Sequence, residues 1–231
     1  MKAAFLKQVL ADRAAKLPVA VVTDLADGRQ AIVHDDGAPT GDIALNDEQI
    51  TEVRKALRAD ESGTLDSADG KLFAQVHNPP PRLLLVGAVH ISQALAPMAA
   101  MTGYGVSVID PRRAFATDER FPGVAMRGDW PDEAMADLKP DRRTAVVTLT
   151  HDPKLDDPAL QAALRSPAFY IGALGSRKTH AARLERLAAA GFTPEQTARV
   201  HGPVGLSIGA LSPAEIAISV LAQITTVRRG G

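Results

Sequence analysis

The chain has 231 residues, of which 45% are hydrophobic, and its formal net charge is −1. This length allows a large domain with a smaller one attached, and the charge balance speaks against a broad nucleic-acid surface, which needs a basic excess. Cysteine is absent, which excludes disulfides, thiolate metal ligands and cysteine nucleophiles. The sequence has no apolar run of ~18 residues and no apolar signal core, so we expect a cytoplasmic protein without a membrane span.

Residues 1–77 are expected to form a small α+β domain. Its expected elements are a helix over 2–17, strands over 19–23 and 30–34 joined by a turn at Asp27-Gly28, a helix over 47–59 capped by Asn46, and a strand over 71–77. The segment that follows, 78–81, reads Asn-Pro-Pro-Pro and predicts a stiff linker. The sequence therefore predicts a domain boundary there.

Residues 82–231 alternate between strand and helix patterns. We expect strands over 82–86, 106–109, 124–126, 144–149, 168–171 and 199–201, and helices over 91–101, 159–164, after Ser176, and over 213–227 with Ser212 as its cap. Alternation of this kind predicts an α/β domain, with a parallel sheet covered by helices on both faces.

Polar residues and glycines gather at the carboxyl ends of these expected strands. In open α/β sheets the ligand crevice lies beyond those ends, so they converge in space. The residues that we expect to line such a crevice are Gly87, Ala88 and His90; Asp110, Arg112 and Arg113; Thr150 and His151; Gly172, Gly175, Ser176, Arg177 and Lys178; and His201, Gly202 and Gly205.

The stretch around Gly175 indicates an anion site. Here an apolar strand runs into glycines, then into Ser176, Arg177 and Lys178, and then into an Ala/Leu/Arg helix pattern. Glycine lets a backbone approach a ligand closely, and helix-start amides favour anions. The alternative is an ordinary glycine entry turn before a helix with a solvated basic face.

The turn after the first strand of this domain only partly matches the dinucleotide fingerprint. Gly87 is in place, but Val89 and Ser92 stand where GxGxxG requires glycine. Asp110 follows at about the spacing of a ribose-binding acid, and the arginines after it could prefer the 2′-phosphate of NADP. The alternative is a plain α/β turn with a capping aspartate.

Three histidines, His90, His151 and His201, are expected at the same crevice. His151-Asp152 could act as an acid/base pair, but we favour His151 as a crevice-lining residue, with Asp152 capping the next turn. Three histidines could hold a metal, yet without a local pair they are more often hydrogen-bond donors to a ligand. We therefore predict neither a catalytic residue nor a metal site.

Residues 82–227 resemble the carboxyl-terminal domain of the XdhC/CoxI family, the accessory proteins of xanthine dehydrogenase and related molybdenum hydroxylases. The segments that carry the resemblance are LLLVGAVHISQAL, VIDPRRAFATDERFP, VVTLTHDPKLDDPAL, YIGALGSRKTHAARLERL and VHGPVGLSIGALSPAEIAISVLAQI. It implies a Rossmann-like domain that binds molybdenum cofactor, as molybdopterin or its dinucleotide form. It also implies a chaperone that holds this cofactor while a cysteine desulfurase exchanges oxo for sulfide, and then delivers it to the apo-hydroxylase.

By this resemblance, the phosphate side of the cofactor would meet Gly172, Gly175, Ser176, Arg177 and Lys178, and the other end would lie near Asp110, Arg112 and Arg113. The amino-terminal region departs from the family, because GAPTGDIALNDEQITEV stands where longer members carry a glycine-rich segment with a cysteine. A thiol contact to molybdenum is thereby excluded. An NAD(P)-dependent oxidoreductase or a nucleotide-binding regulator is the alternative. The carboxyl-terminal helix either completes the core or forms a homodimer surface.

Overall fold

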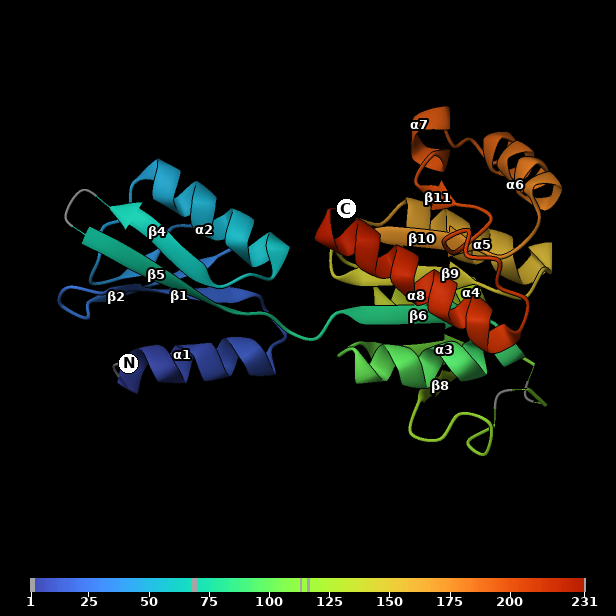
Figure 1. The fold of residues 1–231 in the computed structure, drawn as a ribbon, viewed down its shortest axis with the longest axis horizontal. Coiled ribbons are helices and arrows are strands. Elements are labelled where there is room, and N and C mark those ends of the chain that lie inside the picture. The colour runs from blue at the N-terminus through green and yellow to red at the C-terminus, as the bar shows by residue number, and fades with distance from the viewer. Residues whose placement is uncertain (1–2, 68–69, 113, 116, 231) are drawn as a thin grey trace. The chain divides into compact units, whose positions relative to one another are not determined.

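An antiparallel sheet and a parallel sheet lie in separate parts of the chain (Figure 1). The structure is a computed structural model, and it describes residues 3–67, 70–112, 114–115 and 117–230. The chain divides into two units, Met1–Pro79 and Pro80–Gly231, at a point inside the proline-rich segment. Within the described residues, no helix has the length and apolar character needed to cross a membrane.

The first unit is a five-stranded antiparallel sheet in the order β3-β2-β1-β5-β4. Its elements are α1 (Ala3–Ala14), β1 (Val19–Asp24), β2 (Gln30–His34), β3 (Thr40–Gly41), α2 (Asp47–Ala59), β4 (Gly63–Ser67) and β5 (Gly70–His77). Val19 and Val21 of β1 pack with Val9 of α1, whereas the alternate residues of β1 pack with Val53 and Leu57 of α2. Because successive strand residues face opposite sides, the two helices cover opposite faces.

The second unit carries a six-stranded sheet in which every pair of neighbouring strands is parallel. Its strands are β6 (Arg82–Val86), β7 (Gly105–Ile109), β8 (Ala125–Arg127), β9 (Thr144–Thr148), β10 (Tyr170–Ala173) and β11 (Val200–His201), in the order β11-β10-β9-β6-β7-β8. This is the doubly wound order of Rossmann folds, and the chain reverses direction across the sheet between β6 and β9. The predicted α/β fold is confirmed.

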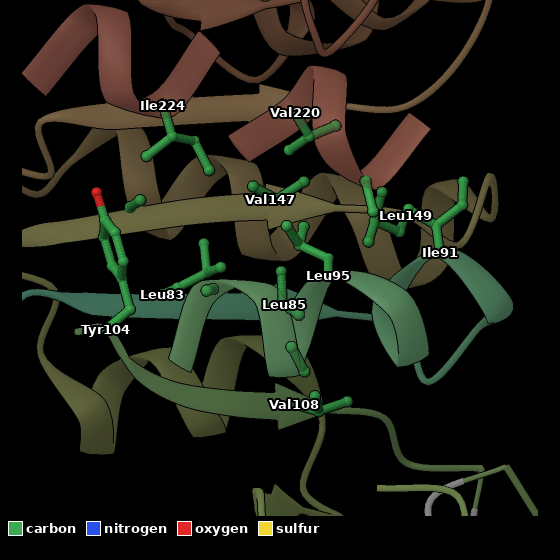
Figure 2. Packing of buried hydrophobic residues seen from close by; sticks show 14 of the residues in the cluster. Leu83, Leu85, Ile91, Leu95, Tyr104, Val108, Val147, Leu149, Val220 and Ile224 are labelled. Atoms are coloured by element: carbon green, nitrogen blue, oxygen red, sulfur yellow. The ribbon is translucent and has the colours of Figure 1, made fainter. Parts of the chain in front are cut away.

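Helices cover both faces of the parallel sheet, as Figure 1 shows. They are α3 (His90–Met101), α4 (Pro131–Leu138), α5 (Pro153–Leu164), α6 (Arg177–Ala189), α7 (Pro194–Thr197) and α8 (Pro213–Arg229). One core lies under α3 and α8, where Leu85 and Val147 of the sheet meet Leu95 and Val220 of the helices (Figure 2). The second core joins the opposite sheet face to α4, α5 and α6. Strands buried on both faces explain the continuous apolar runs in the sequence.

Several expected boundaries were wrong. Strand β10 spans Tyr170–Ala173 rather than 168–171, because it pairs in register with both β9 and β11 through Gly172. Helix α5 begins at Pro153 rather than Ala159, because Asp152 caps it and a proline suits the first helical position. Helix α1 ends at Ala14 rather than at residue 17, and residue 2 lies outside the described part.

Four elements were not anticipated: β3, β4, α4 and α7. Strand β3 has two residues and α7 has four, too few for a periodic signal. Strand β4, with the sequence Gly-Thr-Leu-Asp-Ser, contains a single large apolar side chain. The caps of α2 and α8 did follow the sequence, since Asn46 and Ser212 each form a capping box.

Candidate functional site

Two turns meet at the carboxyl edge of the parallel sheet, where its strand order reverses. Gly87 follows β6 with a φ of +110°, and a Cβ added to it would lie 2.6 Å from Cγ2 of Thr150, which follows β9. The strands themselves are tied there by a 2.9 Å hydrogen bond from the Leu149 amide to the Val86 carbonyl. Only glycine suits this backbone and this approach, so Gly87 and Thr150 lie in contact where Rossmann folds bind ligands.

The start of α3 rises directly from this turn. Val89 is its N-cap, and no side chain of the described residues caps it. The first bonded amide is that of Gln93, which donates to the Val89 carbonyl at 3.1 Å. Ser92, which replaces the third fingerprint glycine, is buried and donates its hydroxyl to the Gly87 carbonyl. The preceding amides, beginning with that of the exposed His90, therefore remain available to an anion.

Asp110 joins the turns that follow β6 and β7. It is fully buried, and its Oδ2 accepts the Ala88 amide at 2.7 Å and Arg112 Nη2 at 2.7 Å. Its Oδ1 accepts the amide and Nε of Arg112, both at 2.9 Å. Burial alone would raise the pKa of Asp110, but these hydrogen bonds bring it below its usual value. The carboxylate and the Ala88 amide are thus engaged within the protein, and Arg113 lies outside the described residues.

The turn after β9 is organised by the Thr150 hydroxyl. It donates to Asp156 Oδ1 at 2.7 Å and accepts the Asp152 amide at 3.0 Å. Asp152 in turn caps α5 by accepting the Lys154 amide at 2.9 Å. His151 is exposed and has a left-handed backbone with a φ of 61°, which is uncommon outside glycine. The predicted capping role of Asp152 is confirmed, since its carboxylate holds the start of α5.

The turn after β10 leads into α6. Gly175 has a φ of +142°, and the hydroxyl of Ser176 caps the helix by accepting the Thr179 amide at 3.1 Å. Arg177 and Lys178 are the first helical residues, and both are exposed. Gly172 differs from the expectation, because it lies inside β10, where an added Cβ would be 2.6 Å from Cγ2 of Val204. Gly172 therefore lets Val204 pack closely against β10. It is not part of the turn that follows this strand.

The segment after β11 is held against α8. The ring of His201, the last residue of β11, stacks on Tyr170 with 4.8 Å between centroids, and burial lowers the pKa of His201. Gly205 has a φ of +97°, contacts Ser219 closely, and donates its amide to Gln223 Oε1 at 2.9 Å. Gly202, similarly, leaves room for the ring of His180. These three residues therefore pack this segment onto its neighbours.

The predicted residues thus fall into two groups. The first group could contact a ligand. It comprises the backbone amides of the turns after β6, β9 and β10 and of the starts of α3 and α6, together with the exposed side chains of His90, His151, Arg177 and Lys178. The second group is engaged in contacts within the protein, and it consists of Ala88, Asp110, Arg112, Gly172, His201, Gly202 and Gly205. Within the described part, no three or more His, Asp or Glu side chains are grouped so that they could hold a metal ion.

Two buried charged residues at this edge were missed by sequence reasoning. Asp156 and Arg183 are each 2% exposed. A signal was present, since Arg183 precedes the buried Leu187 by four positions in α6, and Asp156 lies four positions before Leu160 in α5. Each therefore stands on the core-facing stripe of its helix, where a charged residue is unusual.

Comparison with known proteins places this domain in a family. Residues 83–224 match the family model described as the XdhC Rossmann domain. The chain is 37% identical over 147 residues to the molybdenum cofactor insertion chaperone PaoD of Escherichia coli (strain K12), a match that covers 64% of this chain and 40% of that protein. It is 35% identical over 159 residues to a probable xanthine dehydrogenase subunit of Bacillus subtilis (strain 168), covering 68% and 46%.

A third relative, the uncharacterized protein YqeB of Escherichia coli (strain K12), is 35% identical over 181 residues, or 74% of this chain and 31% of that protein. The matches thus span less than half the length of each of these relatives. The crystal structure of a xanthine dehydrogenase (BH1974) from Bacillus halodurans superimposes with a TM-score of 0.75 at 26% identity, covering 98% of this chain and 67% of that one. The family match takes in the strand ends that form the site, and this chain belongs to the XdhC family.

Proposed function

We propose that this protein binds molybdenum cofactor at the carboxyl edge of its parallel sheet and acts as a maturation chaperone. In this role it holds the cofactor for sulfuration and delivers it to the apo-form of a molybdenum hydroxylase, such as xanthine dehydrogenase. The observation that carries the proposal is the similarity to a molybdenum cofactor insertion chaperone, at 37% identity over 147 residues. In this proposal a partner, a cysteine desulfurase, supplies the sulfur, as the family resemblance implies.

The residues present at the site fit a phosphate-bearing pterin cofactor. The start of α3 has no side-chain cap from the described residues, and the glycine turn before α6 brings further backbone amides to the same edge. Both features favour a phosphate group or, in the dinucleotide form of the cofactor, a diphosphate. When bound, the cofactor supplies the metal and its dithiolene chemistry, and the residues of this chain bind and orient it.

Two features weigh against the alternative of an NAD(P)-dependent oxidoreductase. Each oxygen of Asp110 already accepts two hydrogen bonds, so this carboxylate is not poised to bind ribose hydroxyls. Val89 and Ser92 also stand where the dinucleotide fingerprint requires glycine. The site therefore lacks two of the features by which dinucleotide-binding folds hold NAD(P).

Binding measured by anaerobic calorimetry would test the proposal. The purified protein is titrated with molybdenum cofactor and, separately, with NADPH. We expect a dissociation constant of about 1 μM or lower for the cofactor, corresponding to about −8 kcal/mol, and no comparable binding of NADPH. Transfer of the bound cofactor to an apo-hydroxylase, measured as recovered hydroxylase activity, is the second readout. Binding of NADPH alone, with hydride transfer to a carbonyl, would refute the chaperone function.

A further inference from the structure

Arg183 is a buried cation at the edge of the candidate site. It lies in α6 with 2% of its surface exposed, on the same helix face as Leu187. Burying a charge costs several kcal/mol unless the charge is paired, so arginine is rarely this buried without a carboxylate partner. The free-energy cost of burying Arg183 therefore needs a physical explanation.

The contacts of Arg183 compensate its charge only in part. Its Nη2 donates to the Leu174 carbonyl at 2.7 Å, and Nη1 lies 3.5 Å from His180 Nδ1. Among the described residues, Nε has no hydrogen-bond partner and no carboxylate lies within ion-pairing distance of the guanidinium. Burial lowers the pKa of Arg183, and Asp156 and Asp157 only partly oppose this from a distance.

The guanidinium lies directly against the glycine turn before α6. Leu174, which accepts its hydrogen bond, is the residue before Gly175. A Cβ added to Gly175 would be 3.6 Å from Nη2 of Arg183. The positive charge of Arg183 therefore lies next to the turn at Gly175. The backbone of this turn and the start of α6 belong to the candidate site that a ligand would approach.

We propose that Arg183 supplies the principal charge of an anion subsite at this turn, which takes the phosphate monoester or diphosphate end of the ligand. The inference rests on the proposed function only in assigning that anion to the cofactor. Arg183 positions the turn through Leu174 and attracts the phosphate through a medium of low dielectric, where the attraction is strong. Bound phosphate would offset the cost of the buried cation. The exposed Arg177 and Lys178 contribute an attraction that salt screens.

Calorimetry with inorganic pyrophosphate as the probe, at low and at high salt, tests this. Arg183→Met keeps the shape and removes the charge. We expect an affinity at least about tenfold weaker at both salt concentrations, because the attraction that the buried charge exerts through a low-dielectric medium is lost and salt screens that attraction little. Its melting temperature should be unchanged or higher, since an apolar side chain replaces a buried charge. The control, Arg177→Ala, should bind more weakly only at low salt.

Asp156→Asn provides an opposite test that leaves Arg183 in place. Asparagine keeps an acceptor for the Thr150 hydroxyl but removes a negative charge that acts on Arg183. We expect tighter pyrophosphate binding. Wild-type affinity in a folded Arg183→Met protein would overturn the proposal, as would the absence of pyrophosphate binding by the wild type. If Arg183→Met does not fold, unchanged or weaker binding by Asp156→Asn overturns it.

The two proposals fail separately. A wild-type protein that binds pyrophosphate through Arg183 but does not bind molybdenum cofactor would refute the chaperone function alone. A protein that binds the cofactor with equal affinity before and after Arg183→Met would refute only the role of Arg183.

Discussion

Two buried aspartates at the same sheet edge have pKa values shifted in opposite directions. Burial acts on both, but Asp110 receives hydrogen bonds from Arg112 and from two backbone amides, which bring its pKa below the usual value. For Asp156, burial outweighs the hydrogen bonds from Thr150 and the charges of Arg183 and His151, so its pKa is raised. Asp110 thus stabilises the fold as an anion, whereas burial disfavours the ionised form of Asp156.

The lowered pKa of Asp110 predicts a dependence of stability on pH. Its contribution is fully present above the unfolded pKa of 3.8 and is lost as the pH falls through the lower, folded value. Asp110→Asn should therefore lower the free energy of unfolding by about 1.5–3 kcal/mol at pH ~7, and by less in acid. Urea unfolding at both pH values measures this, with the exposed Asp118→Asn as the control. An equal loss at both pH values would show that the ionised carboxylate is not responsible.

At the scale of elements, α8 has one face that is buried and another that is exposed. Its apolar sequence left two roles open, completing the core or forming a dimer surface. Ala217, Val220 and Ile224 are fully buried and pack with α3 and the sheet (Figure 2), so this face completes the core. Ile218 points elsewhere on the same helix and is 52% exposed.

This difference predicts unequal effects of two matched substitutions. Ile224→Ala should lower the free energy of unfolding by about 2–5 kcal/mol, because it leaves a cavity in the core. Ile218→Ala removes the same atoms from an exposed position and should change it by no more than about 0.5 kcal/mol. Urea unfolding of the two variants compares them. Similar losses would mean that Ile218 is also buried in solution, as in a homodimer.

At the scale of the whole molecule, the two units have separate hydrophobic cores. Among the described residues, the core clusters of Met1–Pro79 contain no residue from Pro80–Gly231, and the reverse also holds. The candidate site draws all its residues from the second unit.

Separate cores predict that the second unit folds by itself. A fragment of residues 80–231 should show one cooperative urea transition, since it contains a complete sheet with helices on both faces. It should also bind pyrophosphate with the affinity of the full chain. Calorimetry of both proteins provides the measurement. A fragment that folds but binds more than tenfold less tightly would place part of the site in the first unit.

Much of the fold and part of the site could be read from the sequence. The alternation of apolar strands with amphipathic helices, the caps Asn46 and Ser212, and the turns at Gly87 and Gly175 depend on neighbouring residues, so a local pattern reveals them. The starts of α3 and α6 belong to this group. So does the family resemblance, because its motifs are contiguous in the chain.

Only the tertiary structure decided the strand order, the position of Gly172 inside β10 and the roles of the charged residues. Asp110 bonds to Ala88, 22 positions away, and Arg183 reaches back nine positions to Leu174. Whether a charge is solvated or buried depends on which elements pack over it, and that packing involves residues distant in the chain. The sequence by itself therefore determined most of the elements and predicted the edge where a ligand would bind. Packing determined which polar groups at that edge remain free.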